Sequence, residues 1–201
     1  MGVGNWTGTG GCEDAFAIPD PVDSDVVWSG CDNGRVVRMD YKHAMARDVS
    51  AWPITSYGWA PADMKYRWDW ITPIAISPHD HNRVYAGAQV VFMTTNGGQS
   101  WRVISPDLTT NDKSRQGNSG GISSDNLTTF DGGTLYSIAE SPGDLASSVG
   151  EMVLMYSVVG AKGRCAPARR VSSTMPSSNW CARSGPSLSM TALSDSNHSR
   201  V

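Results

Sequence analysis

The side chains that could do chemistry gather in one aromatic segment, residues 57–70, which reads YGWAPADMKYRWDW. Hydrolysis of a glycosidic bond usually requires two carboxyl groups about 5 to 9.5 Å apart. The acidic candidates are Asp63, Asp69, Glu13 and Asp14. No motif fixes any two of them as a pair, and Tyr66-Arg67 is the only neighbouring pair of the kind that a sialidase needs. The sequence therefore assigns no catalytic residue.

The same segment is the best candidate for a binding surface. Indole rings beside a guanidinium and a carboxylate can hold a sugar ring or a peptide through apolar faces and a few hydrogen bonds. The alternative, which the pattern favours, is that Trp68 and Trp70 alternate into the core with Tyr66 in the same register. Trp59 and Arg67 then remain as the exposed, ligand-binding pair.

Two further patterns are better explained as turns than as ligand sites. His79-Asp80-His81 could hold a metal, but Asp80 aligns with Asp23, whose neighbours are Val22 and Ser24. An aspartate after proline between two strands typically closes an Asx turn. The glycine-rich residues 118–122 have neither a following helix pattern nor a lysine for a phosphate. We therefore expect no metal and no cofactor.

Residues 71–105 carry the clearest structural pattern. They predict four consecutive strands, at Ile74–Ser77, Arg83–Ala86, Gln89–Thr94 and Trp101–Ser105. The turn between the last two strands has the form Thr94-x-Asn96-x-Gly98-x-x-Trp101, an Asp-box pattern with Asn in place of Asp. We expect Asn96 to bond the backbone of its own turn and Trp101 to be a buried anchor. The motif indicates a fold and not a reaction.

This unit recurs along the chain. Residues 21–30 align with residues 78–87 at an offset of 57, and residues 138–142 align with residues 74–78 at an offset of 64. A repeat of short strands at this length is typical of propeller blades, which run about 40–50 residues. The predicted fold is all-β, a partial β-propeller of about two four-stranded blades and the start of a third. The extra length predicts loop insertions at residues 53–70 and 106–127.

A boundary is predicted near residue 145. Of the 17 aromatic residues only Tyr156 and Trp180 follow it, and no second Asp box appears. Residues 9–144 are therefore interpreted as the propeller fragment. Residues 145–201 are interpreted as an irregular tail that is disordered or non-native, because it offers little apolar surface, although residues 151–160 could form a strand or a short helix.

The cysteines leave two alternatives open. Cys12 and Cys31 flank a predicted hairpin centred near residue 22, so they lie opposite each other and could form a disulfide or remain two buried thiols. Cys165 and Cys181 match no metal pattern.

Composition narrows the function classes. With 201 residues, a net charge of −3 and no basic stripe, the chain is not expected to bind nucleic acid. No signal-like N-terminus and no run of about 18 apolar residues is visible, so a soluble chain and no membrane partner are expected. The compartment is left open, with export of a longer parent as one alternative.

Several motifs together resemble a known family. They are Gly10-Gly11-Cys12-Glu13, Trp70-Ile71-Thr72-Pro73, the turn at 94–101, and Ser105-Pro106-Asp107-Leu108-Thr109. Over residues 9–144 the chain resembles large bacterial β-propeller proteins with neuraminidase-type (BNR, Asp-box) repeats, which are similar to sortilin and often labelled glycosyl hydrolases. The resemblance implies a fragment of a repeat protein. Its implied function is a non-catalytic binding or scaffold module for protein, peptide or glycan ligands, or alternatively part of a sialidase-like or xyloglucanase-like hydrolase. Because a ring closes with about 4–8 blades, such a fragment is expected to self-associate through its open edges.

Overall fold

The computed structural model describes residues 8–12, 16–55, 58–117, 133–140 and the strand at 154–157. These residues form an all-β fold, and the only helical turns among them are three short 3₁₀ turns at Asp32–Gly34, Pro61–Asp63 and Lys113–Arg115. The expected all-β class is thereby confirmed at this level. The predicted tail lies outside the described residues, except for residues 154–157.

The first sheet is a four-stranded antiparallel meander. Its strands, in spatial and chain order, are β1 (Ala17–Pro19), β2 (Val26–Gly30), β3 (Val36–Asp40) and β4 (Met45–Asp48). Alternation along β2 places Val26 and Trp28 on the side that faces the second sheet, where they join the main core.

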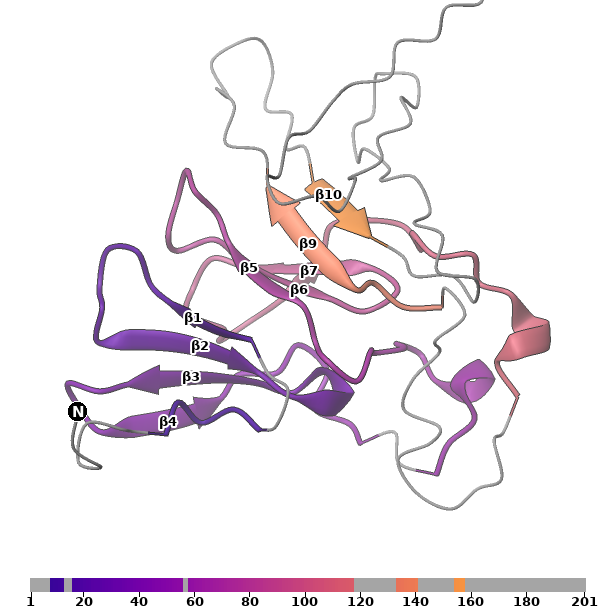
Figure 1. Cartoon of the computed structure of the whole chain (residues 1–201), viewed down its shortest axis with the longest axis horizontal. Coiled ribbons are helices and arrows are strands. Elements are labelled where there is room, and N and C mark those ends of the chain that lie inside the picture. The colour runs from indigo at the N-terminus through magenta and orange to yellow at the C-terminus, as the bar shows by residue number, and fades with distance from the viewer. Residues whose placement is uncertain (1–7, 13–15, 56–57, 118–132, 141–153, 158–201) are drawn as a thin grey trace, which may run out of the picture.

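The second sheet has the same topology. Its strands are β5 (Ile74–Ile76), β6 (Val84–Gly87), β7 (Val91–Thr94) and β8 (Arg102–Val103), hydrogen-bonded in that order. The four strands predicted between residues 74 and 105 are therefore confirmed as consecutive neighbours, with shorter bounds. Two of its strands are buried on both faces, because sheets lie on either side of them (Figure 1).

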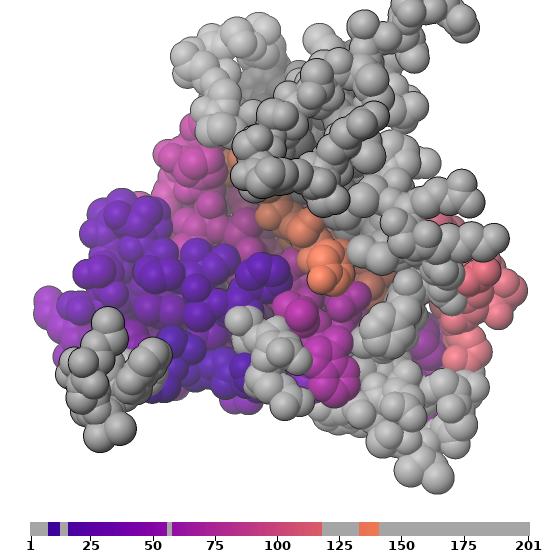
Figure 2. All heavy atoms as spheres, in the orientation of Figure 1, coloured from indigo at the N-terminus to yellow at the C-terminus, as the bar shows by residue number. Residues whose placement is uncertain are grey.

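A third, two-stranded sheet pairs β9 (Ser137–Glu140) with β10 (Leu154–Ser157) in antiparallel register. Tyr85, Val91 and Met93 of the second sheet form a separate core with Leu135, against which Ile138 packs. The orange atoms of residues 133–140 lie directly against the magenta second sheet in the space-filling view (Figure 2). Strand β10 thus continues the sheet structure beyond the boundary predicted near residue 145.

The first two sheets contain equivalent hydrogen bonds, which recur at fixed distances along the sequence. The N–H of Asp20 bonds the carbonyl of Val26, and 57 residues later the N–H of Ser77 bonds that of Arg83. In the third strands the offset is 55, because the N–H of Val36 bonds Ser50 Oγ and the N–H of Val91 bonds Ser105 Oγ. The two residues that separate the offsets lie in the β2–β3 connection, residues 31–35, which is longer than the β6–β7 connection, residues 88–90.

The turn at 94–101 is built by its side chains, as predicted. Asn96 Oδ1 accepts the backbone N–H of Ser100 at 3.0 Å, and Thr94 Oγ1 accepts the N–H of Gly98 at 3.1 Å. Gly97 and Gly98 have positive φ angles of 68° and 81°.

Trp101 was predicted to be a buried anchor, but it is only partly buried, and it packs at the edge between the first two sheets. Its Nε1–H donates to the carbonyl of Val49 at 2.7 Å, and the ring meets Trp28 edge-on with 6.5 Å between centroids. Trp101 therefore joins the second sheet to the first and does not fill the interior of its own sheet.

Candidate functional site: two adjoining hollows around Trp52

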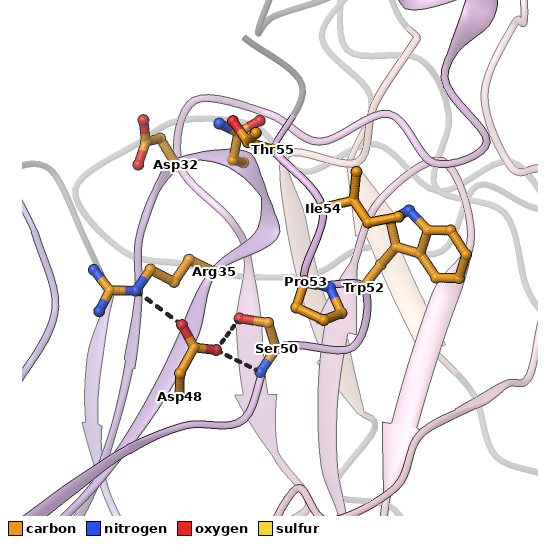
Figure 3. Close-up of a pocket in the computed structure, with 9 residues that line it drawn as sticks. Asp32, Arg35, Asp48, Ser50, Trp52, Pro53, Ile54 and Thr55 are labelled. Atoms are coloured by element: carbon orange, nitrogen blue, oxygen red, sulfur yellow. Dashed lines mark hydrogen bonds and ion pairs between the residues drawn. The ribbon is translucent and has the colours of Figure 1, made fainter.

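A hollow of about 320 Å³ opens where the first sheet ends (Figure 3). Its lining is mixed, and it is here called the polar hollow because Asp32, Arg35 and Asp48 line it. It lies between the β2–β3 connection and the chain that leaves β4. The lining residues are Asp32, Asn33, Arg35, Asp48, Ser50, Trp52, Pro53, Ile54 and Thr55.

Asp48 organises the polar side of this hollow. Its carboxylate accepts the Nε–H of Arg35 at 3.1 Å, and it also accepts the backbone N–H of Ser50 at 3.1 Å and the Ser50 hydroxyl at 2.5 Å (Figure 3). Burial alone would raise the pKa of Asp48, but the bonds from Ser50 and Arg35 outweigh it and lower the pKa below its usual value. Asp48 is therefore a fixed anion in the hollow.

A disulfide lies beside Asp32. The sequence left a bridge and two free thiols as alternatives, and the structure has the bridge, with 2.02 Å between the sulfurs of Cys12 and Cys31. The Oδ1 atom of Asp32 lies 2.9 Å from Cys31 Sγ and 3.8 Å from Cys12 Sγ. These three residues are the one cluster of possible metal ligands within the described ranges. Because the sulfurs are bonded to each other, they are not thiolate ligands in this form.

A second, more apolar hollow of about 170 Å³ adjoins the first and shares Trp52, Ile54 and Thr55 with it. Its other lining residues are Trp59, Asp63, Met64, Lys65 and Tyr66. Trp59 is 56% exposed and Ile54 is 53% exposed. The predicted exposure of Trp59 is thereby confirmed. Residues 48–55 were not predicted to belong to a site, although they carry two signals, an Asp-x-Ser turn and the run Trp52-Pro53-Ile54.

An aromatic chain joins this hollow to the core. The ring of Trp52 meets Tyr66 with 5.3 Å between centroids, and Tyr66 meets Phe92 at 4.8 Å. Phe92 then stacks on Trp68 at 5.4 Å with the ring planes 15° apart. Lys65 Nζ lies 4.6 Å from the centroid of the Trp52 ring and 5.3 Å from that of Tyr66. Trp52 is therefore held in place by contacts with both Tyr66 and Lys65.

The expectation that Arg67 is exposed and binds a ligand with Trp59 is wrong as to exposure. Arg67 is only 3% exposed. Its guanidinium donates to the carbonyl of Gly133 at 3.0 Å, to Asp107 at 2.9 Å and to Thr109 at 3.2 Å. Asp107 and Gly133 follow 40 and 66 residues later in the chain, so the local sequence pattern could not predict these partners. Arg67 therefore connects the segment that leads into β9 with the segment that follows β8.

Trp68 and Trp70 were both predicted to lie in the core, and this is correct for Trp68. Trp68 is buried in the core beside Gly34, where a Cβ atom would lie 2.2 Å from the indole ring. Trp70 and Tyr66 are half-buried, and residues 64–73 form no strand. The segment passes alongside the core without joining a sheet.

Of the other acidic residues, Asp69 and Glu140 lie apart from the two hollows. Asp69 accepts the Thr134 hydroxyl at 2.8 Å. Burial raises the pKa of Asp69 despite this bond. Glu140 accepts the Tyr85 hydroxyl at 3.1 Å, and burial together with the Glu140 charge raises the pKa of Tyr85, which is fully buried. Asp63 lines the apolar hollow, and Glu13 and Asp14 lie outside the described residues.

The segment at 79–81 forms a turn. Asp80 Oδ1 accepts the N–H of Asn82 at 3.0 Å, as Asp23 Oδ1 accepts that of Asp25 at 3.1 Å. His81 Nδ1 lies 3.0 Å from the carboxylate of Asp20 and so links the first two sheets.

No family model matches the chain, and no curated protein matches it. Within the described residues, no helix has the length and apolar character required to cross a bilayer.

Proposed function

We propose that the chain is a non-catalytic binding or scaffold module of the β-propeller type, and that the two hollows around Trp52 receive a protein, peptide or glycan ligand. The observation that carries the proposal is the pairing of a preformed apolar hollow with a polar one. Ligand sites are typically concave, mostly apolar and furnished with a few placed polar groups. Here Trp52 and Trp59 supply the apolar surface, and Arg35 and Asp48 supply the polar groups.

Rigidity of the apolar hollow supports a binding role. Trp52 packs against Tyr66 and also contacts the Lys65 ammonium. A side chain that is already ordered loses little conformational entropy when a ligand arrives. The exposed Trp59 is free to add a second aromatic face, and an exposed large aromatic often marks a contact surface.

Three features support the propeller type. The first two sheets are four-stranded meanders with equivalent hydrogen bonds 57 and 55 residues apart. Their first strands β1 and β5 are adjacent, and β5 is in turn adjacent to β9 (Figure 1). Successive sheets with neighbouring first strands are the arrangement of propeller blades. The Asp-box-like turn at 94–101 is the third feature.

The rival proposal is a fragment of a glycoside hydrolase. That reaction needs a carboxylic acid whose pKa is raised, facing a second carboxylate across the substrate. In the polar hollow, however, the pKa of Asp48 is lowered by Ser50 and Arg35 against the effect of burial. The carboxyl group with a raised pKa, Asp69, lines neither hollow. These observations favour binding over hydrolysis.

A ligand screen tests the proposal. The whole chain is applied to an immobilised oligosaccharide panel and to a displayed peptide library, and the best probe is then titrated against two variants. Trp59→Ala should weaken binding at least about tenfold, because a buried aromatic contact contributes more than about 1.4 kcal/mol. Tyr136→Ala, which removes an exposed aromatic outside both hollows, should bind as the parent does. Equal loss in both variants, or glycan turnover that Asp48→Asn abolishes, would overturn the proposal.

A further inference from the structure

Cys12, Cys31 and Asp32 bring three possible metal ligands together beside the first sheet. Their ligand atoms, the two Sγ atoms and a carboxylate oxygen, all lie within 4.8 Å of one another. Thiolate sulfur and carboxylate oxygen are both ligands that Zn²⁺ takes in proteins. The disulfide prevents such binding in the oxidised chain, and a two-electron reduction removes that obstacle.

Two of the three ligands are held in place by contacts that do not depend on the disulfide. Cys31 and Asp32 are neighbours in the β2–β3 connection. The buried Thr72 hydroxyl donates to the carbonyl of Cys31, and the same oxygen accepts the N–H of Gly34 at 3.1 Å. The Trp68 ring packs on Gly34 so closely that a Cβ atom there would lie 2.2 Å from it. The connection should therefore keep its shape, and the two ligands their positions, after reduction.

Cys12 supplies the third ligand from a segment that can adjust. Residues 8–12 contain three glycines, which tolerate a change of backbone conformation, and Cys12 itself is exposed. The Ser29 hydroxyl donates to the carbonyl of Thr9 at 2.9 Å, three residues before Cys12. The segment therefore stays near the sheet after reduction while its end can shift to accommodate an ion.

The distances are close to those of a tetrahedral site. With Zn–S bonds of about 2.3 Å and Zn–O bonds of about 2.0 Å, two sulfurs lie about 3.8 Å apart, and a sulfur and an oxygen about 3.5 Å apart. Asp32 Oδ1 lies 2.9 Å from Cys31 Sγ and 3.8 Å from Cys12 Sγ, on either side of the sulfur-to-oxygen value. The Cα atoms of the two cysteines are 5.2 Å apart, so both side chains can reach one ion.

We propose that the reduced chain binds one divalent cation of the zinc type at Cys12, Cys31 and Asp32, with water in the fourth position. A dithiol reductant first transfers two electrons and two protons to the disulfide, which becomes two thiols, and the reductant leaves as its own disulfide. The cation then displaces the two thiol protons to the buffer and bonds both thiolates and the Asp32 carboxylate. Two sulfur ligands favour Zn²⁺ over Mg²⁺ and Ca²⁺, which prefer oxygen ligands.

The site is open to solvent on the side of the polar hollow. Asp32 lines that hollow and Cys12 is exposed, so a water molecule can reach the fourth position. The same three residues thus hold a disulfide in an oxidising compartment and a metal ion in a reducing one.

Titration with Co²⁺, a coloured substitute for Zn²⁺, tests the proposal. The whole chain carries Cys165→Ser and Cys181→Ser, so that Cys12 and Cys31 are its only thiols, and it is reduced with a trialkylphosphine, which brings no competing thiol. Without oxygen, we expect saturation at one ion per chain, with a thiolate-to-cobalt absorption band and the visible bands of a tetrahedral ion. Zn²⁺ should then remove both, and the oxidised chain should show neither. A reduced chain that binds no Co²⁺, or binds it without the thiolate band, would overturn the proposal.

Matched carboxylate variants and a denatured sample separate a folded site from two free thiols. Asp32→Asn, which keeps the shape of the side chain, should weaken Co²⁺ binding at least about tenfold, because losing a direct ligand costs no less than losing an outer-shell partner. Asp25→Asn, which neutralises an exposed carboxylate in the β1–β2 turn, should bind as the parent does. In urea the reduced chain should bind more weakly, since the connection that places Cys31 and Asp32 is lost. Unchanged affinity in Asp32→Asn, or in urea, would refute the proposed site.

Discussion

Asp20 closes the turn between β1 and β2 and also reaches the second sheet. Its Oδ1 atom accepts the N–H groups of Val22 at 2.8 Å and Asp23 at 3.1 Å, and the carboxylate meets the His81 ring. At the equivalent position of the second sheet, Ser77 Oγ accepts the N–H groups of His79 and Asp80. The same turn is therefore capped by a carboxylate in one sheet and by a hydroxyl in the other.

We predict that Asp20 makes stability depend on acid pH. Burial alone would raise the pKa of Asp20, but the bonds from Val22, His81 and Asp23 outweigh it, so the pKa lies below its usual value. The carboxylate then stabilises the fold fully above the unfolded-state pKa of about 3.9 and loses this effect as the pH falls through the lower, folded-state pKa.

Denaturant titrations at several pH values check this prediction. Asp20→Ala should lower the free energy of unfolding by about 1 to 2 kcal/mol at pH 7, and the deficit relative to the parent should shrink below about pH 3.9. The exposed Asp25, in the same loop, provides the control Asp25→Ala. A deficit of constant size from pH 7 to pH 3 would contradict the role assigned to the Asp20 charge.

At the scale of the element, the turn at 94–101 gives a second prediction. Asn96 Oδ1 accepts the N–H of Ser100, and its Nδ2 group donates to Ser100 Oγ at 2.9 Å. Asp at this position keeps the acceptor and can accept the Ser100 hydroxyl instead. Asn96→Asp should therefore change the free energy of unfolding by less than about 0.5 kcal/mol, and Asn96→Ala should lower it by about 1 to 2 kcal/mol. Thermal unfolding of the two variants, measured in parallel, tests this prediction. An equal decrease in the free energy of unfolding for both would show that the side-chain oxygen is not the source of stability.

The strands and turns could be predicted because their signals are local. Alternation of apolar residues and Gly-Gly or Asx turns act over a few positions, so β5 to β8 were found to within a few residues. Trp101 and Arg67 were misplaced because their partners are distant in sequence. The Trp101 ring bonds Val49, which lies 52 residues earlier, and the Arg67 guanidinium bonds Gly133, which lies 66 residues later.

The hollows around Trp52 were missed for a similar reason. The polar one needs the β2–β3 connection and the chain after β4 side by side, and only the paired sheet brings them together. Among the residues that line the apolar hollow, Trp59 could be predicted, because a tryptophan in a loop insertion indicates an exposed aromatic surface. The sequence around its neighbours Ile54 and Met64 carries no comparable signal.

At the scale of the whole molecule, the core has two separate parts, one between the first and second sheets and one between the second and third. Arg67 lies at the second of these junctions and bonds Gly133, Asp107 and Thr109. Its side chain is almost fully buried, whereas the Asp107 side chain is about a third exposed. Loss of Arg67 therefore leaves unpaired polar groups inside the molecule but does not strand a fully buried charge.

We predict that Arg67→Met lowers the free energy of unfolding by about 2 to 4 kcal/mol. Exchange in residues 133–140 should rise before that in residues 26–30, because the third sheet loses its tie to the second. Arg115→Met removes a half-exposed ion pair with Asp112 and should cost less than about 1 kcal/mol. Chemical denaturation with hydrogen exchange provides both readings, and a uniform rise of exchange across all three sheets would argue against Arg67 as a local tie.

The unequal hairpins of the first two sheets have a consequence for redesign. The two sheets have equivalent residues up to Gly30 and Gly87, and again from Val36 and Val91 onward. Between these points the first sheet has a loop of five residues and the second sheet a loop of three. The longer loop alone carries Cys31 of the bridge and the hollow-lining Asp32 and Asn33. A graft of residues 88–90 in place of this loop would therefore give a sheet that keeps its strands while losing both the disulfide and the hollow.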